Sequence, residues 1–184
     1  YDSDQDSKAE RSDDVVGNSV YIIDADNGDL LWSAGKEDAD LVLSDMNYSI
    51  PARISVIDRD NDGFADHMYV ADMGGQIFRL DIYNGESRSD LVSGQLLAQL
   101  GADDAENNRR FYYAPDVSEI ATVDEHYYAV AIGSGFRAGP LNTQIQDNFY
   151  MLKDDGVFVR DEFDKFTFPT SAITHSNLRS EEHT

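Results

Sequence analysis

The chain has 184 residues and no cysteine, which excludes disulfide bonds, thiolate zinc sites and thiol nucleophiles. Its 36 acidic and 14 basic residues give a net charge of −22, which argues against nucleic acid and anionic membrane as partners because both would repel such a surface. The hydrophobic content of 41% is enough for a packed core.

The first elements alternate between polar segments and short apolar ones. Residues 1–17 are rich in Asp and Ser and almost lack apolar side chains, which predicts a disordered acidic leader. Residues 20–23 and 30–32 are predicted strands, joined by a turn in which Asn27-Gly28 favours positive φ. A polar loop is expected at residues 35–49.

The next predicted hairpin carries the most informative feature of the chain. Its strands, at about 52–57 and 67–72, flank the loop at residues 58–66. This loop has carboxylates at its positions one, three, five and nine, a glycine for the bend at position six, and a backbone carbonyl at position seven. These positions are Asp58, Asp60, Asp62, Asp66, Gly63 and Phe64.

The spacing of these groups predicts a calcium site. Ca²⁺ takes six to eight oxygen ligands at about 2.3–2.6 Å, and we expect Asp58, Asp60, Asp62, Asp66 and the Phe64 carbonyl to supply most of them, completed by water. The loop is not an EF-hand, because position twelve is Tyr69 rather than a bidentate Glu and the flanks are strands. The alternative is an acidic turn without a metal.

Downstream, Met73-Gly74-Gly75 is a predicted turn before a strand at 76–82, and Asn84-Gly85 is a second turn. Residues 92–100 form either a fourth strand or a short helix, because periodicity does not separate the two. The pattern then repeats, with predicted strands at 117–123, 127–132, 149–152 and 157–159.

The strands therefore fall into two four-stranded antiparallel meanders, at 51–100 and 115–160, preceded by two strands of a third. Units of about 50 residues with four strands are typical of β-propeller blades. We expect an all-β chain with an incomplete β-propeller at 18–165 and a mobile tail at 166–184, as part of a longer polypeptide. A β-sandwich is the second choice.

Candidate catalytic residues are few. The histidines form no metal-ligand pair at helical or hairpin spacing, and His67, directly after the acidic loop, is expected to be a hydrogen-bonded strand histidine. Ser134, within Gly133-Ser134-Gly135, lacks the strand-turn-helix context of a nucleophile elbow. We expect the two glycines to permit a close backbone passage instead.

Two strings together resemble the C-terminal β-propeller of the PilC/PilY family, the type IV pilus biogenesis factors and tip adhesins. One runs from Asp58 to Asp81 and combines the acidic loop with a Gly-Gly turn and an aromatic-Arg-apolar-Asp strand. The other runs from Ala131 to Leu141 and is followed by residues 148–154. The likeness spans residues 19–160.

The resemblance implies a secreted protein of the periplasm, outer membrane or pilus tip of a Gram-negative bacterium. It implies support of pilus extension, twitching motility and adhesion, with pilus components and host or abiotic surfaces as partners. It also implies that Asp58, Asp60, Asp62 and Asp66, with the Phe64 carbonyl, bind Ca²⁺. Neither nucleic acid nor direct membrane insertion is expected.

One further likeness gives the alternative function. Residues 24–32 resemble the blade-docking motif of pyrroloquinoline-quinone enzymes, which would make the chain a fragment of a propeller dehydrogenase. We expect Trp32 to be a structural wedge between blades rather than a cofactor contact. A quinone enzyme also calls for basic and aromatic residues around a central funnel, which the sequence does not reveal, so a non-enzymatic scaffold is the preferred interpretation.

Overall fold

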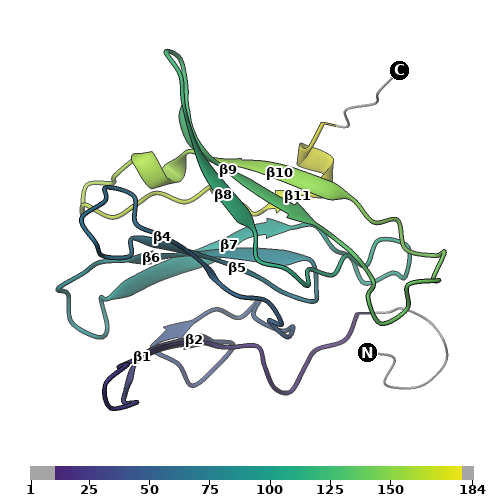
Figure 1. The fold of residues 1–184 in the computed structure, drawn as a ribbon, viewed down its shortest axis with the longest axis horizontal. Coiled ribbons are helices and arrows are strands. Elements are labelled where there is room, and N and C mark those ends of the chain that lie inside the picture. The colour runs from purple at the N-terminus through teal and green to yellow at the C-terminus, as the bar shows by residue number, and fades with distance from the viewer. Residues whose placement is uncertain (1–10, 180–184) are drawn as a thin grey trace.

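The computed structural model describes residues 11–179, which hold eleven β-strands and two single-turn 3-10 helices. The chain is therefore all-β, as the strand pattern predicts. The strands form three small sheets, none of them closed, and Figure 1 shows these sheets one above another in chain order. Residues 1–10 of the expected leader and 180–184 of the expected tail lie outside the described residues.

The first sheet has the order β1-β2-β3. Strands β1 (Val20–Ile23) and β2 (Leu30–Gly35) pair antiparallel across the predicted turn, where Gly28 has a φ of 81°. Strand β3 (Leu41–Val42) pairs parallel to β2 and lies within the segment expected to be only a loop. Two paired residues are too short a pattern to be found in the sequence.

The middle sheet contains the first predicted meander. Strands β4 (Ser55–Ile57), β5 (His67–Ala71), β6 (Gln76–Ile82) and β7 (Val92–Gln99) follow one another and pair antiparallel. The ambiguity at 92–100 is thus decided in favour of a strand. Strand β11 (Ile173–Thr174), within the expected tail, adds a fifth strand parallel to β7.

The third sheet has three strands rather than the expected four: β8 (Asp116–Ala121), β9 (His126–Gly133) and β10 (Phe149–Asp154). The strand predicted at 157–159 is wrong, because Gly156–Phe158 is the 3-10 helix η1. There Val157 is buried in the core and the partly buried Phe158 ring stacks on His126 at 3.5 Å, so these two apolar residues pack without a partner strand. The other 3-10 helix, η2, is His175–Asn177.

Two hydrophobic cores separate the three layers. Between the first and middle sheets, Trp32 packs with Met68 and Val70 of β5. Between the middle and third sheets, Tyr69 and Ala71 of the same strand pack with residues of β9 and β10. Because side chains of a strand alternate between faces, β5 is buried throughout and serves both cores.

The two outer sheets have one buried and one exposed face. Strand β10 alternates fully, with Tyr150 and Leu152 in the core and Phe149 and Met151 in solvent. The outer face of the first sheet exposes other large apolar side chains: Tyr21, Ile23 and Val42. In the part of the chain that the structure describes, no helix has the length and apolar character to cross a bilayer.

Candidate metal centre

The acidic loop connects β4 to β5 and is fixed at its base by backbone hydrogen bonds. Asp66 donates its N–H to the Ile57 carbonyl at 2.8 Å, and its own carbonyl accepts from Ile82 of β6 at 2.7 Å. The Asn84 side chain donates to the Ala65 carbonyl at 3.0 Å. The loop therefore rests on the neighbouring β6–β7 turn as well as on its own hairpin.

Within the loop, aspartate side chains fold the backbone on itself. The Asp58 carboxylate accepts from the N–H groups of Asp62 at 3.2 Å and Gly63 at 2.9 Å, which is the local bonding that favours Asp in turns. Asn61 and Gly63 have φ values of 59° and 93°, in the left-handed region that Asn and Gly tolerate best. Gly63 thus makes the bend that the sequence assigned to it.

Three of the four predicted carboxylates come together. One ligand oxygen from each of Asp58, Asp60 and Asp66 lies within 4.8 Å of the other two. Asp62 is outside this group, and its carboxylate accepts from the Phe64 N–H at 2.8 Å. Among residues 11–179 this is the one cluster of three or more Asp, Glu, His or Cys groups that could hold a metal ion.

The donor set suits a hard cation. All three converging ligands are carboxylate oxygens, which Ca²⁺ and Mg²⁺ prefer, and no imidazole or thiolate is among them. The Arg59 guanidinium is 3.9 Å from Asp60, a long ion pair, while the Arg59 backbone N–H donates to Asp66 at 2.7 Å. This one guanidinium balances only part of the charge of the three carboxylates. The roles of Asp62 and the Phe64 carbonyl as ligands stay predictions.

His67, next to the loop, is a structural residue. It is fully buried, and its Nδ1 lies 2.7 Å from an Asp81 carboxylate oxygen. The Phe166 ring packs against the imidazole at 4.5 Å. The expectation of a hydrogen-bonded strand histidine is confirmed.

Behind His67 lies a buried ion network that the sequence analysis did not anticipate. Arg79 donates to Asp154 at 2.6 Å, to Asp81 at 3.1 Å and to the Thr167 carbonyl at 2.5 Å. Tyr69 donates its hydroxyl to the same Asp154 at 2.9 Å, and burial raises the pKa of this phenol far above its usual value. Burial lowers the pKa of Arg79, but the nearby carboxylates outweigh that effect and raise it overall.

Charged residues at alternate positions of an otherwise apolar strand would have pointed to this network. A strand buried on both faces can contain Arg79 and Asp81 only if each finds a partner. The partners come from β10 and from the segment after η1, which local patterns do not reveal. The network connects all of these elements behind the acidic loop.

Two other residues singled out in the sequence have structural explanations. Trp32 is 1% exposed and packs between the first and middle sheets. Ser134 donates its hydroxyl to Asp147 at 2.9 Å and accepts from the Asn148 N–H at 2.9 Å. The prediction that another backbone segment passes close to the glycines beside Ser134 is wrong, because a Cβ on Gly135 would meet no atom within 4 Å. Such a passage occurs at Gly75, where a Cβ would lie 2.6 Å from the backbone nitrogen of Gly101.

Fold and site together define an all-β protein of stacked sheets with a cluster of three carboxylates on a hairpin loop that could hold a metal ion. No family model, curated protein or solved structure matches the chain. The likeness to the PilC/PilY family therefore depends on the residue strings described above.

Proposed function

We propose that this chain is a calcium-binding β-propeller scaffold of a type IV pilus biogenesis and adhesion factor. The observation that carries the calcium assignment is the convergence of Asp58, Asp60 and Asp66 in a loop whose bend is set by Gly63. Three carboxylates held this close repel one another, so the closed loop gains stability when a divalent cation neutralises them. The pilus assignment comes from the sequence resemblance.

The propeller assignment is supported by how the sheets are stacked. Consecutive sheets lie face to face in chain order, and a hydrophobic core separates each from the next. Both ends of the stack expose apolar side chains, as sheets do when they are made to pack against further neighbours. In a closed ring of blades the outer faces carrying Tyr21 and Phe149 would each contact another sheet.

Calcium supports the scaffold by holding the β4–β5 hairpin closed. Ca²⁺ tolerates a flexible cage of oxygens, whereas Mg²⁺ demands near-ideal octahedral geometry, so the loop favours Ca²⁺. Extracellular sites of this kind bind at about 10⁻⁴–10⁻³ M. A ligand at a hundredfold excess over its Kd stabilises the folded state by about 2.7 kcal/mol.

Calorimetry on chelator-treated protein tests the site. We expect one Ca²⁺ per chain, no binding by Asp60→Ala, and unchanged binding by Asp124→Ala, which removes the same charge from an exposed hairpin tip. The melting temperature should rise with Ca²⁺ far more than with Mg²⁺. Equal shifts from both ions would instead indicate general screening of the −22 charge.

The pilus role is tested in cells that carry Asp60→Ala in the full-length protein. Loss of surface piliation and twitching motility, with Asp124→Ala behaving like the parent, is the expected result. Normal pili in a variant that has lost its metal would show that the ion serves only the stability of the isolated domain.

A further inference from the structure

Strand β10 leaves one edge of the third sheet without a partner. Among the described strands it pairs only with β9. The Ser134 N–H donates to the Asn148 carbonyl at 2.9 Å, so the hydrogen bonds of this antiparallel ladder fall at that pair and at every second pair after it. The backbone groups of the alternate residues therefore point away from β9, and none of them has a hydrogen bond among the described residues. We call the unpaired N–H and C=O groups of Phe149, Met151 and Lys153 the β10 edge.

The protein does not cover this edge with its next segment. Val157, which the strand pattern places in a fourth strand, lies in η1 with its side chain in the core instead of beside β10. The edge also carries apolar side chains, because Phe149 is 74% exposed and Met151 is 65% exposed. An exposed strand edge with unpaired backbone groups and apolar side chains is a template on which another extended chain can pair.

A cavity of about 110 Å³ lies beside the C-terminal end of the β10 edge, where the third sheet meets the middle sheet. The apolar part of its lining comes from β7, β11 and the segment after η1: Leu97, Ile173, Phe168 and Pro169. An apolar cavity of about 150 Å³ can hold benzene, so this one has room for a branched aliphatic side chain. Directly opposite residues of paired strands share a face, so the residue of an added strand that lies opposite the inward-facing Asp154 would point into this cavity.

The charge at this end of the edge favours a basic partner. Asp155 directly follows β10 and is exposed, and its carboxylate has no hydrogen bond or ion pair among the described residues. Lys153 beside it is already paired with Glu125 at 2.5 Å. The chain as a whole has a net charge of −22. A Lys or Arg of a partner therefore fits at Asp155, whereas a second copy of this acidic chain would be repelled.

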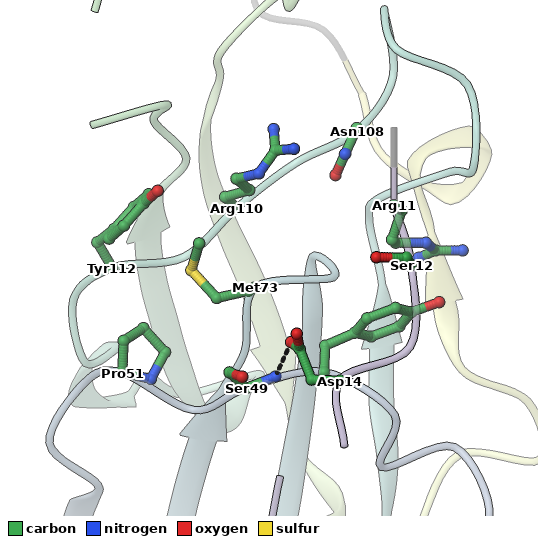
Figure 2. A pocket seen from close by; sticks show the side chains of 10 residues that line it. Arg11, Ser12, Asp14, Ser49, Pro51, Met73, Asn108, Arg110 and Tyr112 are labelled. Atoms are coloured by element: carbon green, nitrogen blue, oxygen red, sulfur yellow. Dashed lines mark hydrogen bonds between the residues drawn. The ribbon is translucent and has the colours of Figure 1, made fainter. Parts of the chain in front are cut away.

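The hollow drawn in Figure 2, of about 270 Å³, differs from the β10 edge because its polar groups bind one another. Asp14 accepts from the Ser49 N–H at 2.8 Å, the bond that Figure 2 marks. Arg11 donates to Asp103 at 2.6 Å and to the Gly74 carbonyl at 2.8 Å. These bonds hold the segment that begins at Arg11 on the body of the protein, so the charges in this hollow serve the fold.

We propose that the β10 edge binds an extended, basic segment of a partner protein as an added antiparallel strand. A branched aliphatic side chain of this segment would fill the cavity at Leu97 and Ile173, and a Lys or Arg would pair with Asp155. Antiparallel pairing continues the pattern of the whole third sheet. Because the added strand runs opposite to β10, its basic residue comes directly before the aliphatic one. The site contains no residue of the acidic loop, so it does not depend on the proposed calcium site.

Selection from random octapeptides displayed on phage tests the proposal. We expect the selected sequences to carry Lys or Arg directly before Val, Ile or Leu. In synthetic copies, Ala in place of the aliphatic residue should weaken binding by about tenfold or more, because the buried apolar area is lost. N-methylation of the alternate amides that face β10 should abolish binding, whereas N-methylation of the intervening amides should change it by no more than about threefold. Fluorescence anisotropy measures each affinity.

Two variants of the protein locate the binding. Met151→Pro removes an unpaired N–H from the β10 edge but leaves the bonds of Tyr150 and Leu152 to β9, so it should weaken binding by about tenfold or more. Met151→Thr, which loses the same side chain but keeps the N–H, is the matched control and should bind far better than Met151→Pro. Ile173→Phe fills the cavity, so it should remove the preference for the aliphatic peptide over its Ala version. Circular dichroism checks that each variant is folded.

Four results would overturn the proposal. They are a selection that yields no binding peptide, equal binding of the two N-methylated forms, parent-like binding by both the folded Met151→Pro and the folded Ile173→Phe proteins, and dimerisation of the chain in sedimentation experiments that Met151→Pro abolishes. The last result would assign the β10 edge to a second copy of the chain.

Discussion

Asp72, at the end of β5, combines full burial with a structural role. One of its carboxylate oxygens accepts from the N–H groups of Gly74 and Gln76, both at 2.9 Å, and so shapes the Gly-Gly turn. The other oxygen has no hydrogen-bond partner among the described residues. Burial raises the pKa of Asp72 from 3.8 to about 7, and the two backbone hydrogen bonds offset only part of that effect.

This raised pKa gives the first prediction. Between pH 4 and pH 7 the folded state binds more protons at Asp72 than the unfolded state, so stability falls as the pH rises through this window. Asp72→Asn keeps the turn-forming oxygen and removes the charge. We expect it to gain stability relative to the parent on going from pH 4 to pH 8, by up to about 4 kcal/mol.

Urea unfolding at pH 4, 6 and 8 measures this difference. The exposed variant Asp45→Asn serves as the control, because it loses the same charge without the burial and should track the parent at every pH. A difference between Asp72→Asn and the parent that stays constant with pH would contradict the raised pKa.

Single residues of the acidic loop were predictable because the interactions that order them are local. Gly63 makes the bend, and Asp58 bonds to N–H groups only four and five residues away. The orientation of Asp62 was not predictable, because its carboxylate can either join the cluster of carboxylates or accept from the Phe64 N–H, and the spacing is the same in both cases. The double arginine that ends in Arg110 stands before three aromatic residues in an otherwise acidic chain. This pattern predicted no contact, because the Arg110 side chain packs against a segment that is distant in sequence.

At the scale of elements, the Arg79 network connects β6 to β10 and to the segment after η1. Its ions are fully or almost fully buried, and the Phe168 ring lies 4.0 Å from the guanidinium. Removing one partner of a buried ion pair leaves an uncompensated charge and costs about 3–5 kcal/mol. The network therefore positions the C-terminal segment over the middle sheet.

We predict that Arg79→Leu destabilises the protein by about that amount in urea unfolding, because Asp81 and Asp154 keep their charges without a counter-ion. Adding Asp81→Asn and Asp154→Asn should recover part of the loss by removing those charges. Arg88→Leu, which breaks the exposed pair with Asp40, is the control and should have little effect because solvent screens that pair. A triple variant no more stable than Arg79→Leu would assign the cost to lost packing.

The strands were predictable where β-branched and aromatic residues are bounded by turn residues, as in β5 and β6. The exceptions depend on partners that are distant in sequence. Residues 157–159 have strand propensity but no neighbouring strand, and the core accepts Val157 in a 3-10 turn instead. Strand β11 and the choice between strand and helix at β7 depend on pairing across many residues. Propensity alone does not contain that information.

On the scale of the whole molecule, the stack has a middle sheet covered on both faces and two end sheets covered on one. Figure 1 shows this order, with β1 and β2 at one end and β8 to β10 at the other. The exposed apolar residues at the ends are consistent with the proposed ring of blades, in which further sheets would cover them. On each end strand, an exposed outer residue and a buried inner residue can be substituted in turn, and the two changes in the free energy of unfolding can be compared.

The last prediction concerns these two end faces. On β10, Met151→Thr on the outer face should change the free energy of unfolding by no more than about 0.5 kcal/mol, whereas Leu152→Thr on the inner face should cost about 2–5 kcal/mol. On β1, Ile23→Thr and Val20→Thr should differ in the same direction. In a longer chain that supplies the neighbouring sheets, the outer substitutions should become costly too, because the same side chains would then be buried. Urea unfolding of each variant in both chains measures the change, and sedimentation confirms that the shorter chain is monomeric. Outer substitutions that remain neutral in the longer chain would contradict a propeller that continues through these faces.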